Sequence, residues 1–227
     1  MLDVHAPHSK IHGFGEFFLH LLTITVGLLI ATQIESCMEW RHHVHLAEDA
    51  QTSLHQEIVR NLADMKDAES GESKWRQEVD DNLKALRRIQ DHPDDPEAQH
   101  AKLAFNFHSI DLRDTAWRTA QSTGALAYMP YEEALRYSEI YWAEGQFVAT
   151  QEQPKEDVAS LIGLLARFNW NDKTKITVDQ AGQMAERLGQ MKLHIVTRDL
   201  LLKKSIEKAD AFLQNRPAKE DFTVNID

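Results

Sequence analysis

Histidine is the residue type in this chain best suited to chemistry, because a neutral imidazole binds transition metals and exchanges protons near neutral pH. The chain has twelve histidines, and eight of them lie in the first 55 residues. Three precede a long apolar run and three follow it: His5, His8, His12, His42, His43 and His45. If the run crosses a membrane, the two groups cannot share a metal within one chain. The second group could bind Zn²⁺ or Cu²⁺ where two chains meet, but histidines on a helix surface explain the same pattern more simply.

Two Glu-x-x-His sequences have the spacing with which di-iron proteins bring two ligands to one helix face. They pair Glu39 with His42 and Glu97 with His100. With 18 glutamates and 12 histidines in 227 residues, about one such pair is expected by chance. Glu39 also lies at the predicted edge of a bilayer. We therefore assign no metal ligand.

Motifs that define common enzyme classes are missing from the sequence, which has no Gly-rich phosphate loop, nucleophile elbow, His-Glu-x-x-His or Cys-x-x-Cys. Six aromatic residues in the middle of the chain could line a ligand pocket, but packing in a core is the simpler use: Trp117, Tyr128, Tyr131, Tyr137, Tyr141 and Trp142. Asp114, nearby, is interpreted as an acid at a helix start. We predict no enzyme activity, no catalytic residue and no cofactor, and a metal-dependent enzyme is the least favoured alternative.

The element that must position everything else is residues 17–34, FFLHLLTITVGLLIATQI, an apolar run without a charged side chain. As a helix it is about 27 Å long, close to the roughly 30 Å hydrocarbon layer of a membrane. A cleaved signal peptide is the main alternative, but Glu16 abuts the run and no basic segment precedes it. We predict a flexible tail at residues 1–16 and an uncleaved transmembrane anchor at residues 17–36.

Small residues at four-residue spacing lie on one face of the predicted anchor: Thr23, Gly27 and Ala31. Such a face lets two helices approach closely in lipid, although small residues are common in membrane helices in any case. Aromatic residues that suit the membrane interface flank the run: Phe14, Phe17, Phe18 and Trp40. Cys37, the only cysteine, could link two parallel anchors, but an idle thiol is the simpler interpretation.

Charge excludes one class of partner. The formal net charge is −11, of which the first 36 residues carry −2, leaving −9 on the body. An acidic body without a basic patch argues against nucleic acid. Lys10 and Arg41 lie on opposite sides of the anchor, so the positive-inside count is nearly even. A short tail before a large domain favours an N-terminus in the cytoplasm, and we predict a bacterial inner-membrane protein with a periplasmic body.

The body, residues 37–216, is predicted to be all-α, followed by a C-terminal tail at residues 217–227. Apolar residues recur at helical spacing over residues 54–86 and again over 184–213. Two long amphipathic helices of the coiled-coil type therefore bracket shorter helices in a bundle. Ser70 and Gly71 interrupt the first long helix, as a kink or as the turn of a hairpin. Residues 91–97, with two prolines, form a loop.

The shorter helices have recognisable ends. One ends near Gly124, one begins at Pro130 and one at Pro154. The sequence from Thr177 has capping-box form and opens the last helix, which Pro217 ends. Four residues define the predicted apolar face of the helix after Pro130: Leu135, Tyr141, Trp142 and Val148. Residues 222–226 alternate as in a strand but are too few to build a sheet.

Several segments resemble an uncharacterised family of bacterial single-pass inner-membrane proteins. They are GEFF at 15–18, VGLLIATQIE at 26–35, the following Trp40 with its long charged helix, and DTAW…STGALAYMPYEEA at 114–134. The resemblance covers the N-terminal third and residues 114–134. It implies a membrane location and a helical body outside the cytoplasm, and it implies no activity.

The leading hypothesis is a non-enzymatic scaffold or accessory component of a membrane complex. Its partners would be the lipid bilayer and either a second copy of the chain or other membrane proteins. The alternative is a sensory or solute-binding helical bundle outside the cytoplasm. The sequence lacks the second span and the output domain that a signalling receptor needs.

Overall fold

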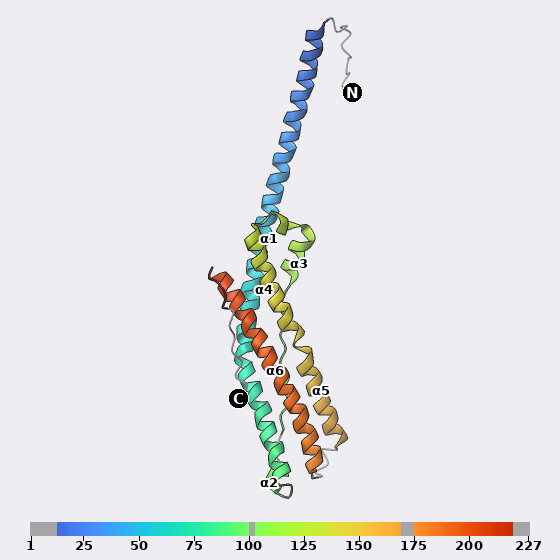
Figure 1. The fold of residues 1–227 in the computed structure, drawn as a ribbon, viewed down its shortest axis with the longest axis vertical. Coiled ribbons are helices and arrows are strands. Elements are labelled where there is room, and N and C mark those ends of the chain that lie inside the picture. Colours follow the sequence, from blue (N-terminus) through green and yellow to red (C-terminus); the bar gives the residue numbers. More distant parts are fainter. Residues whose placement is uncertain (1–12, 100–102, 169–174, 220–227) are drawn as a thin grey trace, which may run out of the picture. The chain divides into compact units, whose positions relative to one another are not determined.

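The computed structural model describes residues 13–99, 103–168 and 175–219, and within these ranges it contains helices and no strand (Figure 1). The prediction of an all-α fold is thereby confirmed for this part of the chain. The helices are α1 (Phe14–Asp91), α2 (Pro96–Gln99), α3 (Thr115–Thr123), the 3-10 helix η1 (Ala125–Tyr128), α4 (Tyr131–Ala149), α5 (Glu152–Arg167) and α6 (Val178–Leu213). The possible strand at 222–226 and residues 1–12 of the predicted tail lie outside the described residues.

The chain divides into two compact units, Met1–Asp49 and Ala50–Asp227. The described part of the first unit is almost entirely helix, because α1 already begins at Phe14, inside the predicted tail. In the second unit α1 continues through Ser70 and Gly71, so the hairpin turn considered there is wrong. A glycine costs a helix only about 1 kcal/mol, which burial of nearby side chains readily outweighs.

Helix α6 runs antiparallel to the part of α1 that follows Ala50 (Figure 1). Three ion pairs with nitrogen–oxygen distances of 2.9 to 3.0 Å fix this direction, because residue numbers rise in α1 as they fall in α6: Lys66–Asp210, Arg76–Asp199 and Asp80–Lys192. Nine of the twelve buried residues of α6 recur in alternating steps of three and four, which is the seam pattern of a coiled coil: Ala181, Met184, Leu188, Met191, Ile195, Arg198, Leu202, Ser205 and Ala209. The part of α1 after Ala50 and α6 thus face each other along seams that are largely apolar and also contain buried polar residues.

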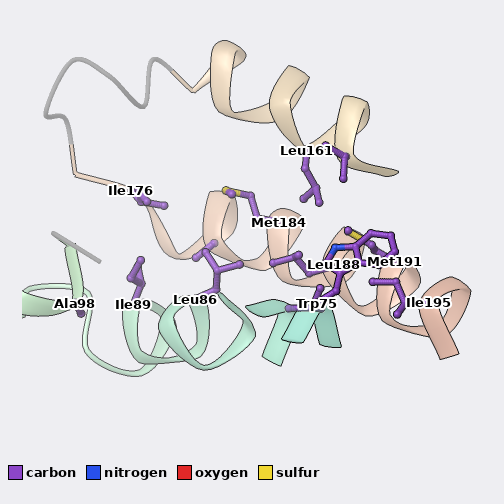
Figure 2. Packing of buried hydrophobic residues seen from close by; sticks show 13 residues of the cluster. Trp75, Leu86, Ile89, Ala98, Leu161, Ile176, Met184, Leu188, Met191 and Ile195 are labelled. Atoms are coloured by element: carbon purple, nitrogen blue, oxygen red, sulfur yellow. The ribbon is translucent and has the colours of Figure 1, made fainter. Parts of the chain in front are cut away.

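Figure 2 shows one part of the core formed by these seams. Leu86 and Ile89 of α1 lie opposite Met184 and Leu188 of α6, and Leu161 of α5 covers them from the other side. Each fully buried aliphatic side chain contributes about 1.5–3 kcal/mol through removal of apolar surface from water. This burial is what holds α1, α5 and α6 together.

Side-chain amides hold the irregular segment at residues 103–114 in place. Each amide accepts a hydrogen bond from a backbone N–H and donates one to the carbonyl of the same residue, as a neighbouring β-strand would. The pairs are Asn82 with Ala104, Gln151 with Ile110, and Asn61 with Arg113, at distances of 2.6 to 3.1 Å. The segment therefore satisfies part of its backbone polarity without joining a sheet.

Several helix ends agree with the sequence, although α5 begins two residues before Pro154, at Glu152, and the predicted loop at residues 91–97 is shortened because α1 ends at Asp91 and α2 begins at Pro96. α3 is followed by Gly124 at φ 74°, a left-handed conformation that glycine adopts without a steric penalty. Thr177 and Gln180 form the predicted capping box at the start of α6. α6 ends four residues before Pro217, at Leu213. The reversal there is a Schellman motif with Asn215 in the left-handed region at φ 50°, and the Arg216 N–H bonds to the Ala211 carbonyl.

The apolar face predicted for α4 is mostly wrong. Leu135, Trp142 and Val148 are exposed, Trp142 by 57 %, and of the four predicted residues only Tyr141 is buried. The residues that α4 buries instead follow the true helical period and include a carboxyl group: Tyr137, Ile140, Tyr141, Ala143, Glu144 and Phe147. Hydrophobicity alone selected the wrong side of this helix, because a glutamate occupies a central position on the buried side.

Candidate functional site

The apolar run lies within α1, the one helix in the described ranges that is long and apolar enough to cross a membrane. None of its most apolar 18-residue window is buried within the chain. The hydroxyl groups of Thr23, Thr25 and Thr32 donate to carbonyls of the preceding turn at 2.8 to 3.0 Å. These three hydroxyl groups are therefore satisfied within the helix itself, as a lipid environment requires.

The predicted contact face of the anchor is exposed in the single chain. Thr23, Gly27 and Ala31 are all exposed, and a Cβ added at Gly27 would have no neighbour within 4 Å. The four predicted interface aromatics, Phe14, Phe17, Phe18 and Trp40, are exposed as well. Phe14 and Phe18 stack with ring centroids 6.4 Å apart. The first unit thus presents apolar and aromatic side chains that nothing within it covers.

The histidine groups form no metal site in the described residues, where no cluster of three or more candidate ligands occurs. His42 and His43 are neighbours with ring centroids 6.0 Å apart, and His45 lies 3.3 Å from Glu48. Glu97 of the second Glu-x-x-His sequence bonds to Arg88. His100, like His5, His8 and His12, lies outside the described residues.

The six aromatic residues of the middle segment do not gather in one place. Tyr137 and Tyr141 are buried, and the Trp117 ring stacks on Tyr141 at 5.1 Å. Tyr128, Tyr131 and Trp142 are exposed instead, and the ammonium group of Lys204 lies 5.6 Å from the centre of the Trp142 ring. The stacked pair belongs to a buried polar network that the sequence did not indicate.

Glu57 of α1 is the centre of this network. Its carboxylate accepts hydrogen bonds from the backbone N–H groups of Ala116 and Trp117 and a 2.8 Å hydrogen bond from the Tyr141 hydroxyl. The two N–H groups belong to the first turn of α3, where a negative charge also meets the positive end of the helix dipole. Asp114, at the N-cap position, makes no capping hydrogen bond with its side chain. A glutamate 59 residues earlier in the chain than Ala116 therefore caps α3.

Glu144 of α4 lies beside Glu57 and is only 3 % exposed. One carboxyl oxygen accepts a 2.9 Å hydrogen bond from Asn61, and the other has no partner among the described residues. The pKa of Glu144 is raised to about 8, mainly by burial and also by the charge of Glu57, against the opposing effect of the hydrogen bond from Asn61. At neutral pH this carboxyl group is therefore protonated. Burial, together with Glu57, also raises the pKa of Tyr141.

A second buried polar group joins α1 to α6. Glu72 and Arg198 form an ion pair, and Arg198 is only 1 % exposed. The rings of Trp75 and Phe147 lie 5.6 and 5.2 Å from the guanidinium carbon, within the range of a cation–π contact. Burial lowers the pKa of Arg198 to about 10, which leaves it charged at neutral pH.

These groups contact the chain's own backbone and side chains. Glu57 caps a helix, Asn61 holds an extended segment, and Glu72 with Arg198 joins two long helices. Their arrangement positions helices, as a structural network does. Comparison of the chain with protein families, with curated proteins and with solved structures found no match.

Proposed function

We propose that this chain is a single-pass protein of the bacterial inner membrane whose helical body lies in the periplasm. In this proposal it acts by association, either with a second copy or as an accessory subunit of a membrane complex. The observation that carries the proposal is the exposed apolar surface of residues 17–34, in which no side chain of the most apolar window is covered. In water such a surface would drive aggregation, whereas lipid covers it without cost.

Two further observations support association over catalysis. The titratable groups with displaced pKa values in the core, such as Glu144 and Arg198, are buried among groups that hold helices together. The formal charge of −9 on the body also disfavours nucleic acid and anionic lipid as partners. A folded body of this kind is suited to presenting a stable surface to another protein.

Extraction of native membranes at alkaline pH tests the anchor. We expect the full-length chain to stay in the membrane pellet, and intact-mass measurement should find residues 17–34 still attached. A soluble mature form that begins near residue 34 would show that the run is a signal peptide. Protease added to spheroplasts should digest the body, and its full protection alongside a digested periplasmic control would reverse the orientation.

Affinity purification in mild detergent then tests association. The chain should co-purify with a second copy of itself or with defined membrane proteins, at fixed stoichiometry. A monomer that brings down no protein at fixed stoichiometry would contradict the scaffold role even if the anchor is correct.

A further inference from the structure

The second unit contains a pocket of about 200 Å³ between α4, α6 and the segment that follows α6. Its apolar lining includes Ile140 and Phe212. Its charged wall carries three cations and one carboxylate: Arg136, Lys208, Arg216 and Glu139.

The wall contributed by the C-terminal segment is fixed in place. The left-handed Asn215 turns the chain back after α6. Arg216 then binds both oxygens of Glu207, at 2.5 and 3.1 Å, and one oxygen of Asp210 at 2.9 Å. A guanidinium held by two carboxylates orders this segment, so the pocket is built into the folded unit.

Carboxylate groups form ion pairs with two of the three cations. Arg216 is held by Glu207 and Asp210, and Lys208 forms a 2.9 Å ion pair with Glu139. Arg136 differs, because its hydrogen-bond acceptors in the described residues are the Asn215 amide oxygen at 3.2 Å and the Phe212 carbonyl at 3.4 Å. Both acceptors are neutral and both distances are long. Among the residues that the structure describes, the pocket therefore holds one positive charge that no carboxylate contacts.

The guanidinium of Arg136 is also oriented for binding. Its central carbon lies 4.8 Å from the centre of the Phe212 ring, so contact with the ring restrains it while its N–H groups keep only weak partners. A helix C-terminus normally disfavours anions, because its last carbonyls carry partial negative charge. Here the backbone N–H groups of Gln214, Asn215 and Arg216 already bond to carbonyls of the last turns of α6. These hydrogen bonds reduce the unfavourable effect of the α6 carbonyl groups on an anion in the pocket.

We propose that this pocket binds a small organic monocarboxylate. The carboxylate would bond to the fork of Arg136 in place of the two long neutral hydrogen bonds, since two parallel N–H to oxygen bonds are the geometry that arginine favours. The apolar part of the ligand would lie against Ile140 and Phe212. The volume restricts the ligand to a few carbon atoms or a single ring. This binding is separate from the proposed membrane association and does not depend on it.

Calorimetric titration of the full-length chain in zwitterionic nanodiscs tests the proposal. The probes are benzoate, butyrate and benzyl alcohol, a neutral analogue of benzoate, each corrected with empty nanodiscs. We expect saturable benzoate binding with a Kd of about 1 mM or tighter, and at least about tenfold weaker binding of benzyl alcohol. No saturable binding of either carboxylate up to about 10 mM, or equal binding of benzoate and benzyl alcohol, would overturn the proposal.

Three variants locate the binding. Arg136→Gln should weaken benzoate binding about tenfold or more by removing the charge. Ala218→Leu should weaken it by filling the pocket while every charge remains. Arg87→Gln, at an exposed position of α1 outside the pocket, should bind as the wild type does. Circular dichroism establishes that each variant is folded. If folded Arg136→Gln and Ala218→Leu both retain wild-type affinity, benzoate binds elsewhere and the assignment is wrong.

Discussion

Asn61 of α1 donates a 2.9 Å hydrogen bond to Glu144 of α4, and the second carboxyl oxygen of Glu144 has no partner among the described residues. A buried carboxyl group with one hydrogen bond is poorly suited to carrying a charge. Its pKa is accordingly raised to about 8, mainly by burial and also by the charge of Glu57 nearby. The proton on Glu144 is therefore part of the folded structure at neutral pH.

Stability of the body should fall as pH rises through the neutral range. The pKa of Glu144 is about 8 in the fold against 4.5 for an ordinary glutamate, so between these values the folded state keeps a proton that the unfolded state has lost. The free energy of unfolding should then fall by up to about 1.4 kcal/mol per pH unit, with this contribution fully present below pH 4.5 and lost by about pH 8.

Urea unfolding in detergent at several pH values measures this dependence. Glu144→Gln should flatten the profile, because glutamine stays neutral and can still accept from Asn61. Glu186→Gln, at an exposed position of α6, serves as the control and should keep the wild-type slope. Equal slopes for the wild type and Glu144→Gln would mean that Glu144 is already ionised at neutral pH.

Replacement of Glu57 should destabilise the packing of α3 against α1. Glu57→Ala leaves the first N–H groups of α3 and the buried Tyr141 hydroxyl without their acceptor, which should cost roughly 2–4 kcal/mol. Tyr141→Phe removes one of these bonds and should cost about 1 kcal/mol. A double-mutant cycle by urea unfolding should give a coupling energy of at least about 0.5 kcal/mol, and strictly additive losses would contradict the contact.

The sequence predicts the apolar buried positions of this structure much better than the polar buried ones. The faces of α1 and α6 were predicted correctly, because Leu54, Ile58, Met184 and Leu188 mark them at regular spacing and all four are buried. The capping box at Thr177 and the turn at Gly124 are local patterns and were also found. Each of these features depends on residues close together in the sequence, so it can be predicted without knowing which helices pack against each other.

The polar groups of the core were missed for a physical reason. Asn61 and Glu72 fall in the apolar seam of α1, and their burial is favourable only because Arg113 and Arg198 meet them from distant parts of the chain. Nothing in the local sequence identifies such partners. The predicted face of α4 is wrong for the same reason, since a pattern of apolar residues does not indicate that a glutamate such as Glu144 is buried.

The buried pair of Glu72 and Arg198 should behave asymmetrically on mutation. Arg198→Met alone leaves Glu72 buried without its partner and should destabilise the body by about 3–5 kcal/mol. Replacing both residues, with Glu72→Leu and Arg198→Met, should restore most of that loss, because an apolar pair needs no solvation. Urea unfolding of the wild type, both single variants and the double variant measures the effect. A double variant no more stable than Arg198→Met would contradict this prediction, because it would mean that the ion pair stabilises the fold beyond cancelling the two buried charges.

The last prediction concerns self-association through the anchor, which is one of the two forms of association in the proposed function. If two parallel helices meet along Thr23, Gly27 and Ala31, their Cys37 side chains approach each other nearly two turns further along. Cys37 is exposed in the single chain and available for such a contact. Oxidation of native membranes should then give a covalent dimer, detected by non-reducing electrophoresis.

Gly27→Ile should reduce this cross-linking several-fold, because a bulky β-branched side chain keeps the two backbones apart. The single helix itself tolerates the change, since a Cβ at Gly27 meets no other group within 4 Å. Leu28→Ile, on a different face of the same turn, is the matched control and should cross-link as the wild type does. If the wild type gives no dimer, or if Gly27→Ile gives as much as Leu28→Ile, the small residues are ordinary composition of a membrane helix. Any self-association must then come from another surface.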